Sequence, residues 1–209
     1  MIVSLCMRTK PILLLGLVLA LAPSLSPLNA QCLRRAIQPK AKQEQAPTDS
    51  IKAKAFLPAS KALVTGQISY LKSPHFRKLG SRYTSRQIYL QNVVADQFEA
   101  MSDAAAKDGI SLKALSGTRT FSQQKGIWER KWAVRKGSAE ERARDILRYS
   151  SMPMTSRHHW GTDIDINNLE NSYFASGKGK AEYEWLCKHG HEYGFAQVFT
   201  DKGQGRPGY

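Results

Sequence analysis

Residues 156–166 read Ser-Arg-His-His-Trp-Gly-Thr-Asp-Ile-Asp-Ile and combine histidine, glycine and aspartate at close spacing. His158 precedes Asp165 by seven residues, and Gly161 lies between them. A turn at the glycine can bring an imidazole and a carboxylate onto one cation, and both groups are ordinary ligands of Zn²⁺. The alternative is a polar loop with a buried histidine and a capping aspartate, and these residues alone leave both interpretations open.

The same stretch ends in the alternating pattern of a β-strand at residues 163–166. Because successive side chains point to opposite faces of a strand, Asp163 and Asp165 share one face while the two isoleucines point to the core. Asp163 can then orient a metal ligand without binding the ion itself.

A second polar cluster, at residues 116–124, reads Ser-Gly-Thr-Arg-Thr-Phe-Ser-Gln-Gln and lies between a predicted strand and a predicted helix. The guanidinium of Arg119 can bind a substrate carboxylate through two parallel hydrogen bonds. Gln124 follows about one helical turn later and can hold a peptide carbonyl or amide. Considered without the rest of the chain, however, Arg119 is better interpreted as a surface charge beside a helix cap.

A third cluster, at residues 185–195, contains His189 and His191. Two residues two positions apart on a helix do not share a face, so these histidines make a poor metal pair. We expect them to serve structure and packing.

Hydrophobic periodicity predicts the elements around these clusters. A helix is expected over residues 87–108, since Val94, Phe98, Met101 and Ala105 recur at helical spacing and Gly109 follows. Ser138 and Glu141 form a capping-box pattern that opens another helix. The remaining expected elements are helices over 122–136, 138–149 and 180–193 and strands over 110–115, 163–166 and 195–199. Helices around a small sheet indicate an α+β domain.

Composition limits the organisation of the chain. Its 209 residues include 42% hydrophobic residues and three cysteines. These values exclude a disordered chain and a disulfide scaffold, and they suit one modest domain with tails. We expect a signal peptide at 1–30, a basic flexible linker at 31–61 and one domain at 62–209, in which Cys187 is a buried free thiol.

The first 30 residues have the pattern of an export signal. Arg8 and Lys10 precede a short apolar run over 12–22, and Leu-Asn-Ala before Gln31 suits signal-peptide cleavage. The run is too short to span a bilayer of about 30 Å, so we expect no transmembrane anchor. We expect an exported protein of the periplasm or cell envelope, and lipidation at Cys32 is the less favoured interpretation.

The chain is strongly basic, with 31 Lys and Arg against 17 Asp and Glu. Outside the cytoplasm, such a surface is better matched by an anionic cell envelope than by nucleic acid. A basic nucleic-acid binder is a rival interpretation, but no nucleic-acid motif accompanies the charge, so no nucleic-acid partner is expected.

Together, the three clusters resemble the zinc D-alanyl-D-alanine carboxypeptidases of the vancomycin-resistance D,D-carboxypeptidase type, which share a core fold with Hedgehog signalling domains. The resemblance covers residues 85–209. The matching motifs are Ser-Gly-Thr-Arg-Thr…Gln at 116–124, Ser-x-His-x-x-Gly-x-Asp-x-Asp at 156–165 and Trp-Leu…Tyr-Gly-Phe at 185–195. The resemblance implies a small antiparallel sheet flanked by helices.

The resemblance also implies roles for single residues. His158 and Asp165 would be ligands of one Zn²⁺ ion, Arg119 would stabilise charge on the substrate, and Gln124 and Ser156 would contact the peptide. The substrate would be a peptidoglycan stem peptide, cut at a D-alanyl-D-alanine or related bond. Thr118 stands where the family has tyrosine, and Asp163 stands where it has a small residue.

One departure concerns the family's C-terminal Glu-x-Trp-His-Trp segment, which supplies the general base and the third zinc ligand. These 209 residues contain no Glu-x-x-His pattern, and the chain stops at Gly208-Tyr209. We expect a fragment of a longer enzyme, because the upstream motifs keep their spacing. The alternative is a catalytically inactive peptidoglycan-binding protein. Carboxypeptidase, dipeptidase and endopeptidase activities all remain open.

Overall fold

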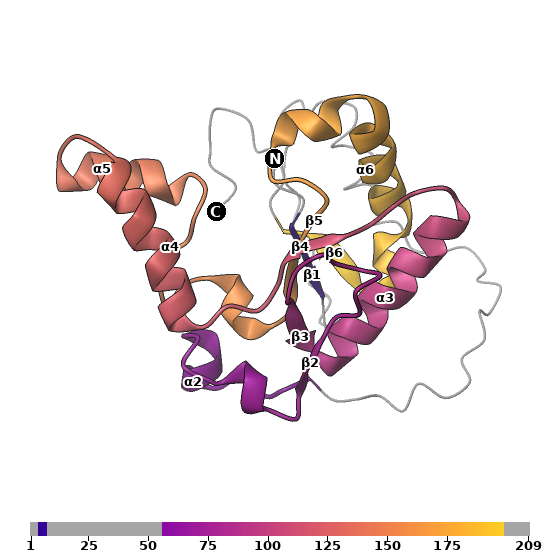
Figure 1. Cartoon of the computed structure of the whole chain (residues 1–209), viewed down its shortest axis with the longest axis horizontal. Coiled ribbons are helices and arrows are strands. Elements are labelled where there is room, and N and C mark those ends of the chain that lie inside the picture. The colour runs from indigo at the N-terminus through magenta and orange to yellow at the C-terminus, as the bar shows by residue number, and fades with distance from the viewer. Residues whose placement is uncertain (1–3, 8–55, 199–209) are drawn as a thin grey trace, which may run out of the picture.

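The structure is a computed structural model that describes residues 4–7 and 56–198. Its centre is a four-stranded sheet with the order β4-β5-β1-β6, in which each pair of neighbours runs antiparallel. These strands are β4 (Ala114–Ser116), β5 (Asp163–Ile166), β1 (Ser4–Met7) and β6 (Phe195–Gln197). A small antiparallel sheet with helices around it confirms the predicted α+β fold (Figure 1).

Strand β1 comes from the stretch that the sequence predicts to be a signal peptide. It lies between β5 and β6, with Ser4 opposite Asp165 and Met7 opposite Phe195. The segment that follows it, at 8–55, lies outside the described residues. The predicted boundaries of leader and linker therefore stay predictions, although residues 4–7 pair with the strand that carries the two aspartates.

The helices surround this sheet. In Figure 1, α3 and α6 lie to the right of the sheet, and the α4–α5 pair extends to the left. The α-helices are α2 (Lys61–Val64), α3 (Asn92–Lys107), α4 (Phe121–Val134), α5 (Ala139–Leu147) and α6 (Gly177–His189). The 3₁₀ turns are η1 (Tyr70–Lys72), η2 (Arg157–Trp160), η3 (Asn171–Ala175) and η4 (Gly190–Tyr193).

Helix α3 supplies the middle of the apolar core. Its predicted apolar face is correct, because Val94, Phe98, Met101 and Ala105 are all fully buried. Each large apolar side chain removed from water in this way contributes roughly 1.5–3 kcal/mol before entropy is counted. Phe195 of β6 packs edge-on against Phe98, with ring centroids 6.5 Å apart. The core therefore ties α3 to the central sheet.

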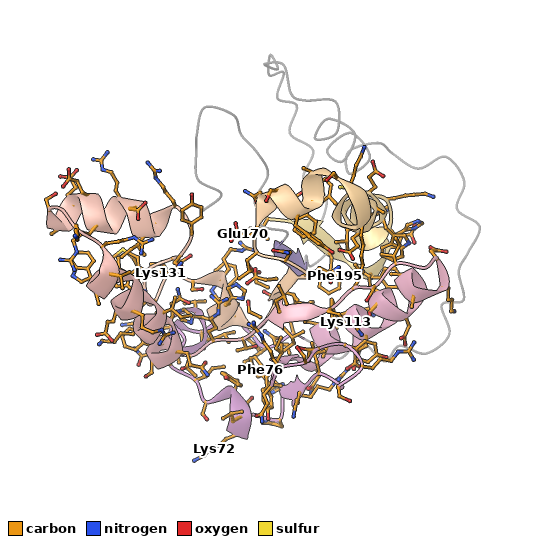
Figure 2. All side chains as sticks on the ribbon, turned by 45° about the horizontal axis from the view of Figure 1, so that its top comes forward. Lys72, Phe76, Lys113, Lys131, Glu170 and Phe195 are labelled. Atoms are coloured by element: carbon orange, nitrogen blue, oxygen red, sulfur yellow. The ribbon has the colours of Figure 1, made fainter. Side chains whose placement is uncertain are left out.

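A second sheet pairs β2 (Phe76–Lys78) with β3 (Tyr89–Gln91). The helix predicted from residue 87 therefore begins only at Asn92, because residues 89–91 pair with β2 instead. Phe76 belongs to a smaller cluster with Leu63 and Tyr70, separate from the cluster that contains Phe195. Figure 2 labels both phenylalanines.

Helices α4 and α5 begin with complete capping boxes. In α5 the Ser138 side chain accepts from the backbone N–H of Glu141, and the Glu141 carboxylate accepts from the backbone N–H of Ser138. This confirms the predicted start. Thr120 and Gln123 repeat the arrangement at α4. Two orphan N–H groups are satisfied at each start, which contributes about 1 kcal/mol per cap.

Three further findings concern the predicted linker, Cys187 and membrane-spanning helices. Phe56 and Leu57, at the end of the predicted linker, pack against the two apolar clusters. Cys187 is disulfide-bonded, so the expectation of a free thiol there is wrong. Among the described residues, the search for a helix long and apolar enough to cross a membrane finds none.

Candidate functional site

The His158 side chain is held in one orientation by the loop before α4. It comes from the 3₁₀ turn η2 and is buried. Its Nδ1 atom lies 2.9 Å from the carbonyl oxygen of Gly117, which can only accept, so Nδ1 carries the proton. The other ring nitrogen, Nε2, lies 3.3 Å from Asp165 Oδ2, where it donates a hydrogen bond when the ring is protonated and offers its lone pair to a metal when the ring is neutral.

The glycine turn between the two residues is needed for this approach. Gly161 ends η2 in the left-handed region, with φ +72°. A Cβ at this position would lie 2.3 Å from Cε1 of Phe76, so the turn fits only glycine. Strand β5 starts two residues later and carries Asp163 and Asp165, which are both buried. The two faces alternate as predicted, but both are covered.

The Asp165 carboxylate lies among donors. Ser116, opposite it in the pairing of β4 with β5, donates its hydroxyl to Oδ2, and Nη2 of Arg119 lies 3.3 Å from the same oxygen. Burial by itself raises the pKa of Asp165, but the charges and hydrogen bonds of His158, Arg119 and Ser116 outweigh it and bring the pKa down to about 2. Asp165 is therefore an anion at neutral pH.

Arg119 reaches the same point from the loop between β4 and α4. Its Nη2 donates to Ser116 Oγ at 2.7 Å, and its Nη1 donates to Gln124 Oε1 at 3.3 Å. The side chain keeps 23% of its surface exposed. Arg119 therefore has a fixed guanidinium with one side still open to a ligand.

Gln124 and Ser156 support the site from inside the protein. Both are buried, and Gln124 uses its amide on two protein groups: Oε1 accepts from Arg119, and Nε2 donates to the carbonyl of Ser151 at 2.7 Å. This geometry gives Gln124 a positioning role for Arg119. Ser156 precedes η2, and its carbonyl accepts from the backbone N–H of His159.

Asp163 binds the side chain of Arg157, the residue before His158. Its carboxylate accepts from Nε of Arg157 at 2.9 Å and from Nη2 at 3.4 Å. The Arg157 guanidinium also lies over the ring of Trp160, 4.7 Å from its centroid. Asp163 therefore fixes Arg157 at the start of η2, and through it Trp160 at the end of η2. His158 lies between these two residues.

His159 is a residue of this site that the sequence reasoning missed. It is fully buried, its Nδ1 lies 2.8 Å from the carbonyl of Arg119, and its Nε2 accepts from the backbone N–H of Met154. Burial is the main reason why its pKa is lowered from the ordinary histidine value. A neutral histidine thus links the loop of Arg119 to the loop of His158. In the sequence, the direct succession of His158 and His159 is the signal that could have pointed to this role.

The substituted position Thr118 also anchors the loop. Its hydroxyl donates to the carbonyl of Tyr89 at 2.6 Å, and its backbone N–H donates to the same oxygen. The adjacent Gly117 packs so closely that a Cβ would lie 2.6 Å from Cγ2 of Ile88. The loop is therefore tied to β3 immediately beside His158.

In the third cluster, His189 has the predicted packing role, whereas His191 is exposed. His189 stacks on Trp185 with ring centroids 4.8 Å apart, and its Nδ1 lies 3.3 Å from Glu192. The indole N–H of Trp185 donates to Asp108.

His158 and Asp165 suit a zinc ion as two of its donors. Two ligands at the usual 2.0–2.2 Å from a tetrahedral zinc lie about 3.3–3.5 Å apart, which matches the 3.3 Å between Nε2 and Oδ2. Among the residues that the structure describes, no group of three or more His, Cys, Asp or Glu could hold a metal. The described part of the site therefore contains two donors.

The buried His–Asp pair beside a small antiparallel sheet suits the family that the sequence motifs resemble. Residues 87–209 match the family model of VanY, D-alanyl-D-alanine carboxypeptidase. This match covers more than half of the chain, and the chain belongs to that family.

Two curated relatives agree with this assignment. YodJ of Bacillus subtilis (strain 168), which is named as a carboxypeptidase, is 29% identical over 109 residues, 51% of this chain and 38% of the relative. A D-alanyl-D-alanine carboxypeptidase of Enterococcus faecalis (strain ATCC 700802 / V583) is 30% identical over 113 residues, 51% of this chain and 39% of the relative. The aligned part thus spans about two-fifths of each relative.

Two solved structures show the same fold. The LD-carboxypeptidase LdcB superposes with a TM-score of 0.52 at 22% identity, over 66% of this chain and 64% of LdcB. VanYB, solved with D-alanine-D-alanine, superposes with a TM-score of 0.50 at 21% identity, over 64% of this chain and 70% of VanYB.

Proposed function

We propose that this protein is a zinc-dependent peptidase that hydrolyses D-alanyl-D-alanine or related bonds in peptidoglycan stem peptides. The observation that carries the proposal is the approach of His158 Nε2 to Asp165 Oδ2 at 3.3 Å, with the imidazole fixed by Gly117. Membership of the VanY family supports the reaction class. The named relatives are carboxypeptidases, which supports cleavage at a chain end.

The donor pair would hold the metal with the chain's own hydrogen bonds. The Gly117 carbonyl keeps the His158 proton on Nδ1, and the low pKa of Asp165 keeps its carboxylate ionised. Bound at this pair, zinc would supply Lewis-acid polarisation of the scissile carbonyl and a more acidic bound water.

Arg119 would act on the substrate. Its guanidinium is fixed by Ser116 and Gln124 and keeps an open side, so it can offset negative charge that develops on a substrate oxygen. Because the Gln124 amide is used within the protein, its part is to hold Arg119 in place.

The test compares His158→Ala and Asp165→Asn with His191→Ala, an exposed histidine outside the site. Zinc content and D-alanine release from a D-alanyl-D-alanine peptide are measured on the full-length gene product, including any residues that its reading frame encodes beyond Tyr209, with thermal melts as a folding control. We expect both site variants to lose zinc and D-alanine release, and His191→Ala to keep both. Unchanged zinc content in His158→Ala would overturn the proposal, and peptide binding without release would indicate a binding protein.

Export to the periplasm or cell envelope is the second part of the proposal. The leader pattern over 1–30 supports it, and so does the disulfide at Cys187, because disulfides persist in oxidising compartments. Mass spectrometry of the protein from the envelope fraction tests it. We expect an N-terminus at Gln31, and an intact residue 1 on a cytoplasmic protein would contradict it.

A further inference from the structure

A cavity of about 370 Å³ adjoins the donor pair and has no assigned role. Its walls come from η1, the segment before β3, the loop between β4 and α4, and the first turns of α4. Ser116, Gly117 and Arg119 line it. The same three residues contact Asp165 or His158, so the cavity is continuous with the candidate active site.

All the charged side chains that line this cavity are positive. Arg86, Arg119 and Arg130 line it, and none of its lining residues is an aspartate or glutamate. Among the described residues, Arg119 has Asp165 within ion-pair distance, whereas Arg86 and Arg130 have no carboxylate that close. Other arginines of this domain are neutralised: Arg77 contacts two carboxylates, and Arg135 contacts Asp145.

Both unneutralised arginines are positioned at the cavity. Nη1 of Arg86 donates to the carbonyl of Leu115, which lines the same cavity. Nη1 of Arg130 lies over α4 at Gly126, where an added Cβ would be 3.3 Å away. Glycine at 126 therefore leaves room for the guanidinium beside the cavity.

The remaining polar wall is neutral and already hydrogen-bonded. The Gln123 amide donates to the hydroxyl of Tyr70 at 2.9 Å, and Oε1 of Gln123 accepts from the backbone N–H of Thr120. The wall thus adds no negative charge that could offset the three guanidinium groups.

We propose that this cavity is a subsite for a carboxylate of the peptide substrate, separate from the scissile bond. The inference rests on the proposed function and deepens it, since it makes the preferred substrate a peptide with an additional free carboxylate. Arg86 and Arg130 would bind that carboxylate, because guanidinium groups form charge-assisted, bidentate hydrogen bonds with carboxylates.

The first experiment probes the cavity without peptide or catalysis. Arginine Nε–H signals of the ¹⁵N-labelled full chain are followed while glutarate or inorganic phosphate is added. We expect glutarate to shift the signals of Arg86 and Arg130, the Arg130 shift to be lost in R86Q, and the Arg86 shift to be lost in R130Q. R144Q removes an equal charge from α5, outside the cavity, and keeps the shifts. Absence of any glutarate shift, or a shift with phosphate alone, overturns the carboxylate subsite.

The second experiment uses two D-alanyl-D-alanine peptides that differ only at one internal residue, glutamyl in one and glutaminyl in the other. We expect the glutamyl peptide to bind about tenfold more tightly, an effect typical of a hydrogen bond between charged groups. R86Q and R130Q would each reduce this preference several-fold, whereas R144Q would not.

The outcomes separate the subsite from the proposed function. Equal binding of the two peptides, or a preference that both variants retain, overturns the subsite while leaving the peptidase proposal intact. If glutarate binds at Arg86 and Arg130 but neither peptide binds, the anion site stands, its assignment to the peptide substrate is overturned, and the proposed function fails.

Discussion

The backbone N–H of Arg119 donates to the carbonyl of His158 at 3.0 Å. Arg119 thereby joins the loop before α4 to the turn that carries the His158 imidazole. The link is double, because the Arg119 carbonyl lies 2.8 Å from Nδ1 of His159. Arg119 and His158, for which we propose roles in substrate and metal binding, thus keep one relative position although they come from distant parts of the chain.

Replacing Asp165 by asparagine removes a buried charge that faces His158 and Arg119. At pH 7 we expect a loss of about 3–5 kcal/mol of unfolding free energy, because a buried pair is broken at one partner. Urea unfolding measures it. Asp145→Asn removes a half-exposed partner of Arg135 and is the control, with an expected loss below about 1 kcal/mol.

The same carboxylate predicts a pH dependence. The folded pKa of Asp165, about 2, lies below its ordinary value, so its stabilisation is present above about pH 4 and is lost as pH falls toward 2. The difference in unfolding free energy between wild type and Asp165→Asn should therefore narrow over that interval. A difference that stays constant from pH 7 to pH 2 would contradict the assignment.

His159 predicts a second pH dependence at milder acidity. Burial lowers its folded pKa below the ordinary value near 6.5, so the unfolded chain takes up a proton first and stability falls as pH drops below 6.5. Urea unfolding at pH 8 and pH 5 measures this. We expect His159→Gln to be less stable at pH 8 but to lose less between the two pH values. His191→Gln, at an exposed position, should keep the wild-type profile, and an equal profile in His159→Gln would refute the prediction.

Gly161→Ala tests the turn before β5. The variant has a positive φ and a contact of 2.3 Å with the Phe76 ring, so we expect a loss of more than about 2 kcal/mol in unfolding free energy. Gly109→Ala is a matched control, since Gly109 has φ +74° but nothing within 4 Å of an added Cβ. Its expected loss is about 1 kcal/mol, the strain of the backbone conformation alone. Equal losses would show that Phe76 yields without cost.

Removing residues 1–30 tests the pairing of β1. Strand β1, at residues 4–7, lies between β5 and β6, so its loss leaves unpaired backbone groups on both strands. We expect faster amide hydrogen exchange in residues 163–166 and 195–197 than in the full chain, while α3 stays protected. Unchanged protection of β5 and β6 would mean that another segment pairs in the place of β1.

The sequence predicted the elements whose signals are local. Strand β5 occupies the predicted residues because its alternation is complete, and α5 begins where Ser138 and Glu141 form their capping box. His158 and Asp165 also lie close together as their spacing predicted, since Gly161 makes the turn between them, and their binding of a metal stays a prediction.

Features that depend on distant partners could not be predicted. Residues 89–91 form a strand only because β2 lies beside them, and nothing within that stretch opposes a helix. Likewise, the Asp163 carboxylate pairs with Arg157, and this pairing depends on how η2 folds back over β5. The role of His159 also requires the loop of Arg119 to be in place.

The place of β1 links biosynthesis to the shape of the site. If leader peptidase removes residues 1–30, the precursor and its product differ in the middle of the sheet that carries Asp165. The precursor would then have a filled sheet, whereas the product would offer two adjacent edges that can accept a new strand. Leader cleavage would therefore change how the sheet is completed beside the strand that carries Asp165.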